Sequence, residues 1–148
     1  MANEVIYAWG TQKTLEANGG SCANTAIVQA NDASYGVVAD GASFPDARFV
    51  WKGQFATVTS IENKTIDLYA RALNIDGTND QNAPTATYTQ KYIGSFVLQA
   101  SSSSTDQYVS LVAYDVPAEA DYYIINSSGQ TLSAGWTLKV TPRTYKPA

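Results

Sequence analysis

The residues from Asn74 to Asp80 place oxygen-bearing side chains at alternate positions of a loop that contains a glycine. Alternating oxygen ligands are typical of the start of a calcium-binding loop. Such a loop is completed by a bidentate glutamate at its twelfth position, but the twelfth position counted from Asn74 is Thr85, and the glycine is misplaced. We therefore interpret the segment as a turn stabilised by its own side chains and expect no bound metal. Its candidate ligands for a cation would be Asp76, Thr78 and Asp80.

Catalytic groups are scarce in this chain. Histidine is absent, which excludes Ser-His and Cys-His nucleophile pairs and histidine-ligated zinc. The single cysteine, Cys22, has no cluster of basic residues beside it in the sequence that would lower the pKa of its thiol. Two carboxylates could hydrolyse a glycosidic bond, but the spacing of the acidic residues singles out no pair. We expect a protein that is not an enzyme and that uses no cofactor.

Aromatic residues supply the other candidates for binding, because the chain contains ten tyrosines and three tryptophans. Exposed aromatic rings can stack on sugar rings or anchor a protein interface. Trp51 and Trp136 fall in phase with the apolar faces of their segments, so we expect both in the core. Trp9 stands at the end of an expected strand, Tyr69 lies outside the apolar phase of its segment, and Tyr145 lies close to the C-terminus. These three are the candidate interface or ligand residues.

The charge of the chain argues against two classes of partner. Its net charge is −4, its pI is about 4.6, and no run of Lys or Arg occurs. Nucleic acids and anionic membranes both attract clustered positive charge, so we expect neither as a partner. The opening residues MANEVIYAWG lack the pattern of a signal peptide, and a single cysteine forms no internal disulfide. We expect synthesis and folding in a cytoplasm.

Short segments rich in Val, Ile, Tyr, Phe, Thr and Trp alternate with turn residues, which favours an all-β fold. The expected strands are 4–8, 26–30, 35–39, 48–58, 65–73, 92–98, 108–114, 121–126 and 136–141. We predict an antiparallel β-sandwich in a single domain, residues 1–148, and prefer jelly-roll over immunoglobulin-like connectivity. Two prolines near the C-terminus lead us to expect an arm, residues 141–148, that leaves the sheet.

Two segments indicate the inner faces of the sandwich. Large apolar residues recur at alternate positions in each of them, a period that directs side chains to one face of a strand. The residues concerned are Phe49, Trp51 and Phe55 in the first segment, and Trp136, Leu138 and Val140 in the second. We expect both sets to pack in the core.

Three segments of the C-terminal two-thirds resemble small structural proteins of tailed-bacteriophage virions. They are LYARALNIDGTND (68–80), YIGSFVLQASSSSTDQYVSLVAYDVP (92–117) and YYIINSSGQTLSAGWTLKVTPRTYKPA (122–148). The resemblance implies a protein that decorates or cements the capsid, or a part of the tail or its fibres. It implies residence in the virion after synthesis in the host cytoplasm, and the major capsid protein or another virion protein as the partner.

Two functions from different classes remain open on the sequence. The first is a non-enzymatic virion protein that acts by protein–protein contacts and forms a homo-oligomer, with three copies as the expected number. The second is a carbohydrate-binding module, or a tail or fibre component, that recognises host glycan through exposed aromatic rings. Burial of the tryptophans distinguishes them, because a planar exposed cluster favours sugar and buried indoles favour the structural function.

Overall fold

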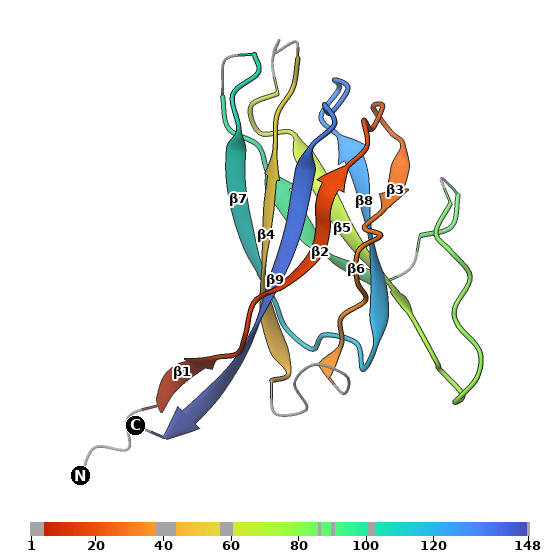
Figure 1. Ribbon diagram of the computed structural model, residues 1–148, viewed down its shortest axis with the longest axis vertical. Coiled ribbons are helices and arrows are strands. Elements are labelled where there is room, and N and C mark those ends of the chain that lie inside the picture. Colours follow the sequence, from red (N-terminus) through yellow and green to blue (C-terminus); the bar gives the residue numbers. More distant parts are fainter. Residues whose placement is uncertain are drawn as a thin grey trace.

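The computed structural model describes residues 5–37, 44–56, 61–85, 87–89, 91–100 and 103–147. These residues form two antiparallel sheets that pack face to face, so the fold is an all-β sandwich, as the sequence predicts (Figure 1). In the following, the sheet that contains β9 is called the first sheet, and the sheet that contains β8 is called the second sheet.

The first sheet has the order β1-β9-β4-β7, and β2 also pairs with β9. Its strands are β1 (Val5–Trp9), β2 (Lys13–Gly19), β4 (Asp46–Gly53), β7 (Gln107–Ala113) and β9 (Trp136–Pro147). β1 and β2 lie end to end along the same side of β9, because β2 pairs with its first half and β1 with its second half. The long strand β9 therefore connects the body of the sandwich to its N-terminal strand (Figure 1).

The second sheet has the order β3-β8-β5-β6. Its strands are β3 (Ile27–Gln29), β5 (Thr65–Ala72), β6 (Lys91–Val97) and β8 (Ala120–Ser127). The period of two that predicts β5 is visible in its burial, since Ile66, Leu68 and Ala70 are fully buried and the residues between them are partly exposed.

The strands pair in a nested series. β5 pairs with β6, β4 with β7, β3 with β8, and β2 with β9, so each pair encloses the previous one along the chain. Members of successive pairs alternate between the two sheets. The chain is thus an antiparallel ribbon of paired strands, with β5 and β6 at its closed end, wrapped around one core.

The core between the sheets is rich in aromatic side chains. Trp51 of β4 stacks on Phe96 of β6 with ring centroids 6.3 Å apart, and Phe49 packs on Tyr122 of β8 at 5.1 Å. The predicted inward residues are all buried, with at most 1% of each side chain exposed: Phe49, Trp51, Phe55, Trp136, Leu138 and Val140. The prediction of two inward-facing apolar rows is confirmed.

One strand is not expected from the sequence, and two expected strands differ from the structure. β2 was not predicted, because its sequence KTLEANG has no apolar alternation and it is a strand through its pairing with β9. In the expected strand 35–39, Tyr35 forms an isolated bridge with Ala120, and residues 38–39 lie outside the described residues. The expected strand 48–58 ends earlier, at Gly53, after which Phe55 makes one bridge with Leu132; residues 57–58 lie outside the described residues.

Candidate functional site: an aromatic ribbon at one end of the sandwich

The C-terminal segment is part of the first sheet, so the expectation that residues 141–148 leave the sheet as an arm is wrong for residues 141–147. Thr141, Pro142 and Arg143 lie in β9 between β4 on one side and the β1–β2 edge on the other. Proline is accommodated at residue 142 because the pairing partner of β9 changes there from β2 to β1, with a shift of one residue in register. The carbonyl oxygen of Pro142 accepts the N–H of Gly10 at 2.9 Å. Residue 148 lies outside the described residues.

Beyond Arg143, β9 extends past the end of β4 and pairs only with β1. Residues 5–8 and 144–147 thus form a two-stranded ribbon that projects from the sandwich, at lower left in Figure 1. Cross-strand neighbours share a face, so the pairing of Tyr7 with Tyr145 and of Trp9 with Arg143 places these four side chains on the outer face of the first sheet.

These side chains belong to what we call the aromatic–arginine cluster: Tyr7, Trp9, Arg48, Tyr114, Arg143 and Tyr145. The rings of Tyr7 and Tyr145 lie 4.9 Å apart, centroid to centroid. The guanidinium carbon of Arg143 lies 4.4 Å from the centroid of Tyr7 and 5.4 Å from that of Tyr114, and Arg48 lies 4.8 Å from Trp9. Cation–π contacts at these distances hold the cluster together.

The arginine and the rings of this cluster differ in exposure. Only 6% of Arg143 is exposed, whereas about half of each of Tyr7, Trp9 and Tyr145 and 64% of Tyr114 are exposed. Arg143 Nη2 lies 3.7 Å from the carboxylate of Asp46. Burial alone would lower the pKa of Arg143, but a hydrogen bond with Tyr114 and the neighbouring tyrosines outweigh it and raise that pKa. The result is a fixed positive charge beneath an apolar, exposed surface.

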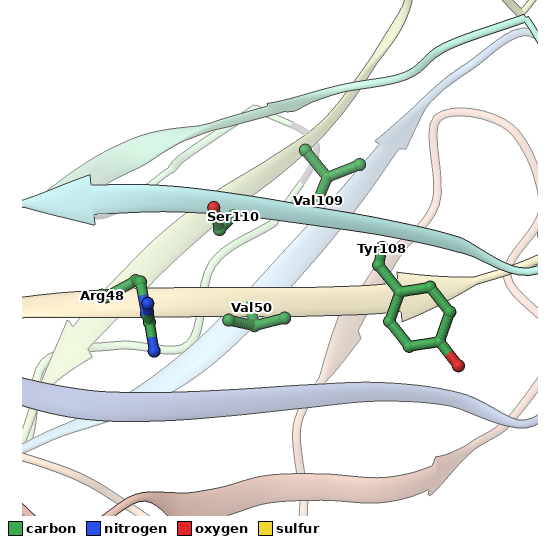
Figure 2. A pocket seen from close by; sticks show the side chains of 5 residues that line it. All are labelled: Arg48, Val50, Tyr108, Val109 and Ser110. Atoms are coloured by element: carbon green, nitrogen blue, oxygen red, sulfur yellow. The ribbon is translucent and has the colours of Figure 1, made fainter.

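The outer face of the first sheet continues from the cluster as a basic surface. An open depression of about 310 Å³ lies there. Figure 2 shows the side chains that line it, among them Arg48 and Val50 on β4 and Tyr108 and Ser110 on β7. A second depression, of about 430 Å³, adjoins Val50 and Tyr108 and also contains Lys52 and Lys139. The side chains that line the two depressions are basic, apolar or hydroxyl-bearing, together with the amide of Gln12.

Of the candidate aromatic residues, Trp9 and Tyr145 belong to the cluster and Tyr69 does not. Tyr69 lies on the outer face of the second sheet, half-buried, with its ring 5.4 Å from that of Tyr92. Burial raises the pKa of Tyr69. Nearby, the carboxylate of Asp67 accepts hydrogen bonds from the hydroxyls of Ser95 and Ser127. Tyr69 therefore has polar and aromatic neighbours of its own, separate from the ribbon.

The loop with the candidate metal ligands is held by hydrogen bonds within itself. Asp76 Oδ1 accepts the backbone N–H groups of Thr78 and Asn79 at 3.0 and 2.7 Å, and Asp76 Oδ2 accepts the side-chain amide of Asn79 at 2.6 Å. These hydrogen bonds lower the pKa of Asp76 to about 2, and the bond with the Asn79 side chain has the largest effect. Asp80 accepts the N–H of Asn74 and lies 3.3 Å from Arg71. Among the described residues, no group of three or more His, Cys, Asp or Glu side chains could hold a metal ion.

Sequence reasoning missed four members of the cluster: Tyr7, Arg48, Tyr114 and Arg143. Tyr7 carried a usable signal, because it stands two residues before Trp9 and therefore on the same face of β1. Arg48, Tyr114 and Arg143 join the cluster only through the pairing of β4 with β9 and β7, which no local pattern reveals.

Comparison of the chain with protein-family models, with curated proteins and with solved structures finds no match. Within the described part of the chain, no helix is long and apolar enough to cross a membrane.

Proposed function

We propose that this chain is a non-enzymatic structural protein of a bacteriophage virion, which decorates or cements the particle by docking on another virion protein. The observation that carries the proposal is the projecting ribbon with its aromatic–arginine cluster. Aromatic residues and arginine are enriched at protein interfaces, and they contribute most of the binding energy there. The partner is the major capsid protein or another virion protein, and the chain resides in the virion as a homo-oligomer.

The connectivity supports the same proposal. We assign the sandwich to the jelly-roll class, on the grounds that its nested pairs alternate between the two sheets. Jelly rolls occur in viral capsid proteins and in lectins, and a fold alone does not define a function. The fold therefore fits both functions left open by the sequence, and the surface must decide between them.

The surface favours protein contact at the ribbon. A sugar-binding platform requires rings that present one flat face, but Tyr7 is tilted by 39° to Trp9 and by 41° to Tyr145. Trp51 and Trp136 are fully buried and thus unavailable to a ligand. A tilted, partly exposed aromatic group around a fixed arginine is better suited to a protein surface that can fill the spaces between the rings.

Glycan binding stays a second candidate at another place, the outer face of the second sheet. There Tyr92, which is 54% exposed, hydrogen-bonds Ser95, whose hydroxyl reaches Asp67. An aromatic ring beside hydroxyl and carboxylate groups is a combination that can bind a sugar. Binding of host glycan that is abolished by Tyr92→Ala and unaffected by Tyr7→Ser would favour this second function.

The proposal is tested by the binding of purified, labelled chain to phage particles that lack it. Tyr7→Ser combined with Tyr145→Ser removes two exposed rings of the cluster and should abolish binding. The matched control, Tyr88→Ser combined with Tyr92→Ser, removes two exposed tyrosines that lie outside both the cluster and the two depressions, and it should bind as the wild type does. Equal binding by both double variants would refute docking through the ribbon.

A further inference from the structure

The ribbon is incomplete as a sheet. Two strands alone are only marginally stable in water, and a third strand or a packed face is needed for independent stability. Beyond Arg143 the ribbon has no β4 neighbour, and it exposes apolar side chains on both faces: Val5 and Tyr7 on one, Ile6 on the other. A further strand at one of its edges would remove this deficit.

The hydrogen bond from Gly10 to Pro142 shows which backbone groups of β1 are available for that strand. Gly10 faces β9 with its N–H, and successive residues of an antiparallel strand alternate in direction. Ala8 and Ile6 therefore also face β9, whereas the N–H and C=O groups of Val5, Tyr7 and Trp9 point away from it. Since β1 is the last strand of its sheet among the described residues, these groups form an open edge.

The two edges of the ribbon differ in their protection against pairing. The β9 edge carries Lys146 and ends at Pro147, and proteins use lysine and proline to prevent edge-to-edge association. β1, with the sequence VIYAW, has no charge, no proline and no register shift against β9. Of the other edge strands, β2 pairs irregularly with β9, β3 has only three residues, and β6 carries Lys91 and pairs with β5 through a register shift. β7 is also uncharged and regular, but it lies against β6 at the side of the sandwich, whereas β1 projects from the body.

We propose that β1 pairs with β1 of a second copy of this chain, antiparallel and across a twofold axis at Tyr7. This inference rests on the proposed structural function, and it names a partner for the ribbon. The pairing joins two ribbons into a four-stranded sheet with the order β9-β1-β1-β9. It makes about six new backbone hydrogen bonds, two for each facing pair of residues.

The sequence of β1 is complementary to itself in this register. Val5 lies opposite Trp9 of the second copy, Tyr7 opposite the second Tyr7, and Ile6 opposite Ala8. Aromatic residues opposite β-branched or aromatic residues stabilise an antiparallel pair. Because β1 carries no charged residue, the twofold axis brings no like charges together on the paired strands.

The area of the ribbon indicates how tightly two copies associate. About half of each of Tyr7, Trp9 and Tyr145 is exposed. Since a whole aromatic side chain can bury about 150–250 Å², the three rings offer roughly 300 Å² per copy. Even with Val5 and Ile6 added, the pair stays below the 1,200–2,000 Å² typical of stable complexes. The pair should therefore dissociate on dilution. A threefold ring built from the ribbons alone would pair β1 with the protected β9 edge of the next copy, so the edge chemistry of the ribbon favours two copies over three.

Proline substitutions at facing positions of the ribbon test the pairing. Tyr7→Pro removes an N–H of the open β1 edge, whereas Tyr145→Pro removes an N–H that points to the β9 edge, so both leave the bonds between β1 and β9 in place. Tyr7→Ser and Tyr145→Ser lose the same rings but keep the N–H groups, and they are the matched controls. The mass of each full-length variant is measured by sedimentation equilibrium over a range of concentrations, with near-ultraviolet circular dichroism as the check on folding.

We expect the wild type to pass from monomer to dimer, and Tyr7→Pro to raise the dissociation constant about tenfold or more relative to Tyr7→Ser. Tyr145→Pro should have the same dissociation constant as Tyr145→Ser. If Tyr7→Pro does not fold, Ile6→Lys places a charge on the same edge and should weaken the dimer, while Ile75→Lys in an exposed loop should not. A wild-type monomer at every concentration, a trimer, or equal association of the Tyr7 variants would overturn the inference. If the chain is a monomer but still binds phage particles, the pairing is refuted and the proposed function stands. If the chain is a dimer but binds no particle, the pairing stands and the proposed function is refuted.

Discussion

The backbone of Gly19 lies directly against the indole ring of Trp136. A Cβ atom placed on Gly19 would be 2.0 Å from Trp136 Cε2, and the indole N–H donates a hydrogen bond of 2.8 Å to the carbonyl oxygen of Gly20. This contact fixes β2 against the start of β9 and closes one end of the core. It explains why a glycine occupies the last position of a strand that pairs with a tryptophan.

Gly19→Ala should therefore destabilise the protein by about 1–3 kcal/mol, because the new methyl group must displace the ring in a packed core. The matched control is Gly20→Ala, since a Cβ on Gly20 meets nothing within 4 Å. Urea unfolding of the two variants gives the comparison. Equal stability of the two would show that the close approach to Trp136 does not constrain residue 19.

Trp136→Ala should cost about 3–5 kcal/mol of unfolding free energy, because it leaves a large cavity between the sheets. Trp9→Ala is the control for loss of an indole, since 46% of Trp9 is exposed and none of Trp136 is. We expect the Trp9 variant to lose much less stability. A Trp136 variant as stable as the wild type would contradict a structural role for this ring.

The loop at Asp76 should keep its hydrogen bonds in moderately acidic solution. The pKa of Asp76 in the folded protein is about 2, below its ordinary value of 3.8, so folding favours the charged carboxylate. The resulting contribution to stability is present above about pH 4 and is lost as the pH falls toward 2. An NMR titration of the carboxyl carbon should give a midpoint near 2, and Asn79→Ala should raise it. A midpoint near 4 in the wild type would mean that these hydrogen bonds do not form.

Calcium should leave the melting temperature unchanged. Both oxygens of Asp76 already accept hydrogen bonds within the loop, and Asp80 is engaged by Asn74 and Arg71. The measurement is thermal unfolding with about 1 mM calcium and with a chelator, since a site that binds below this level would raise the melting temperature by mass action. A rise of several degrees that Asp76→Ala abolishes would identify a metal site.

Sequence patterns predict those parts of this fold that have a local cause. The alternation of Phe49 with Trp51 and of Trp136 with Leu138 indicates buried strands, because every second side chain of a strand faces the core. β2 has no such pattern and becomes a strand only through its partner β9. The C-terminal prolines suggested an arm, but proline is tolerated where pairing is irregular or where a strand ends.

The candidate site follows the same rule. Trp9 and Tyr145 can each be recognised as an aromatic residue outside the core. That they lie on the same face depends on the register between β1 and β9, two strands that are far apart in the sequence. The contribution of Arg143 depends further on Tyr114 of the loop after β7. Such contacts between distant segments leave no periodic signal in the sequence.

The most direct test of the central proposal is the amount of this chain in purified phage particles. The measurement is quantitative mass spectrometry of particles from cells that express the chain, together with imaging of the same particles. A structural protein should be present in many copies, in a fixed ratio to the major capsid protein, at regular positions on the particle. Abundant chain in the infected cell with none in the particles would contradict the account.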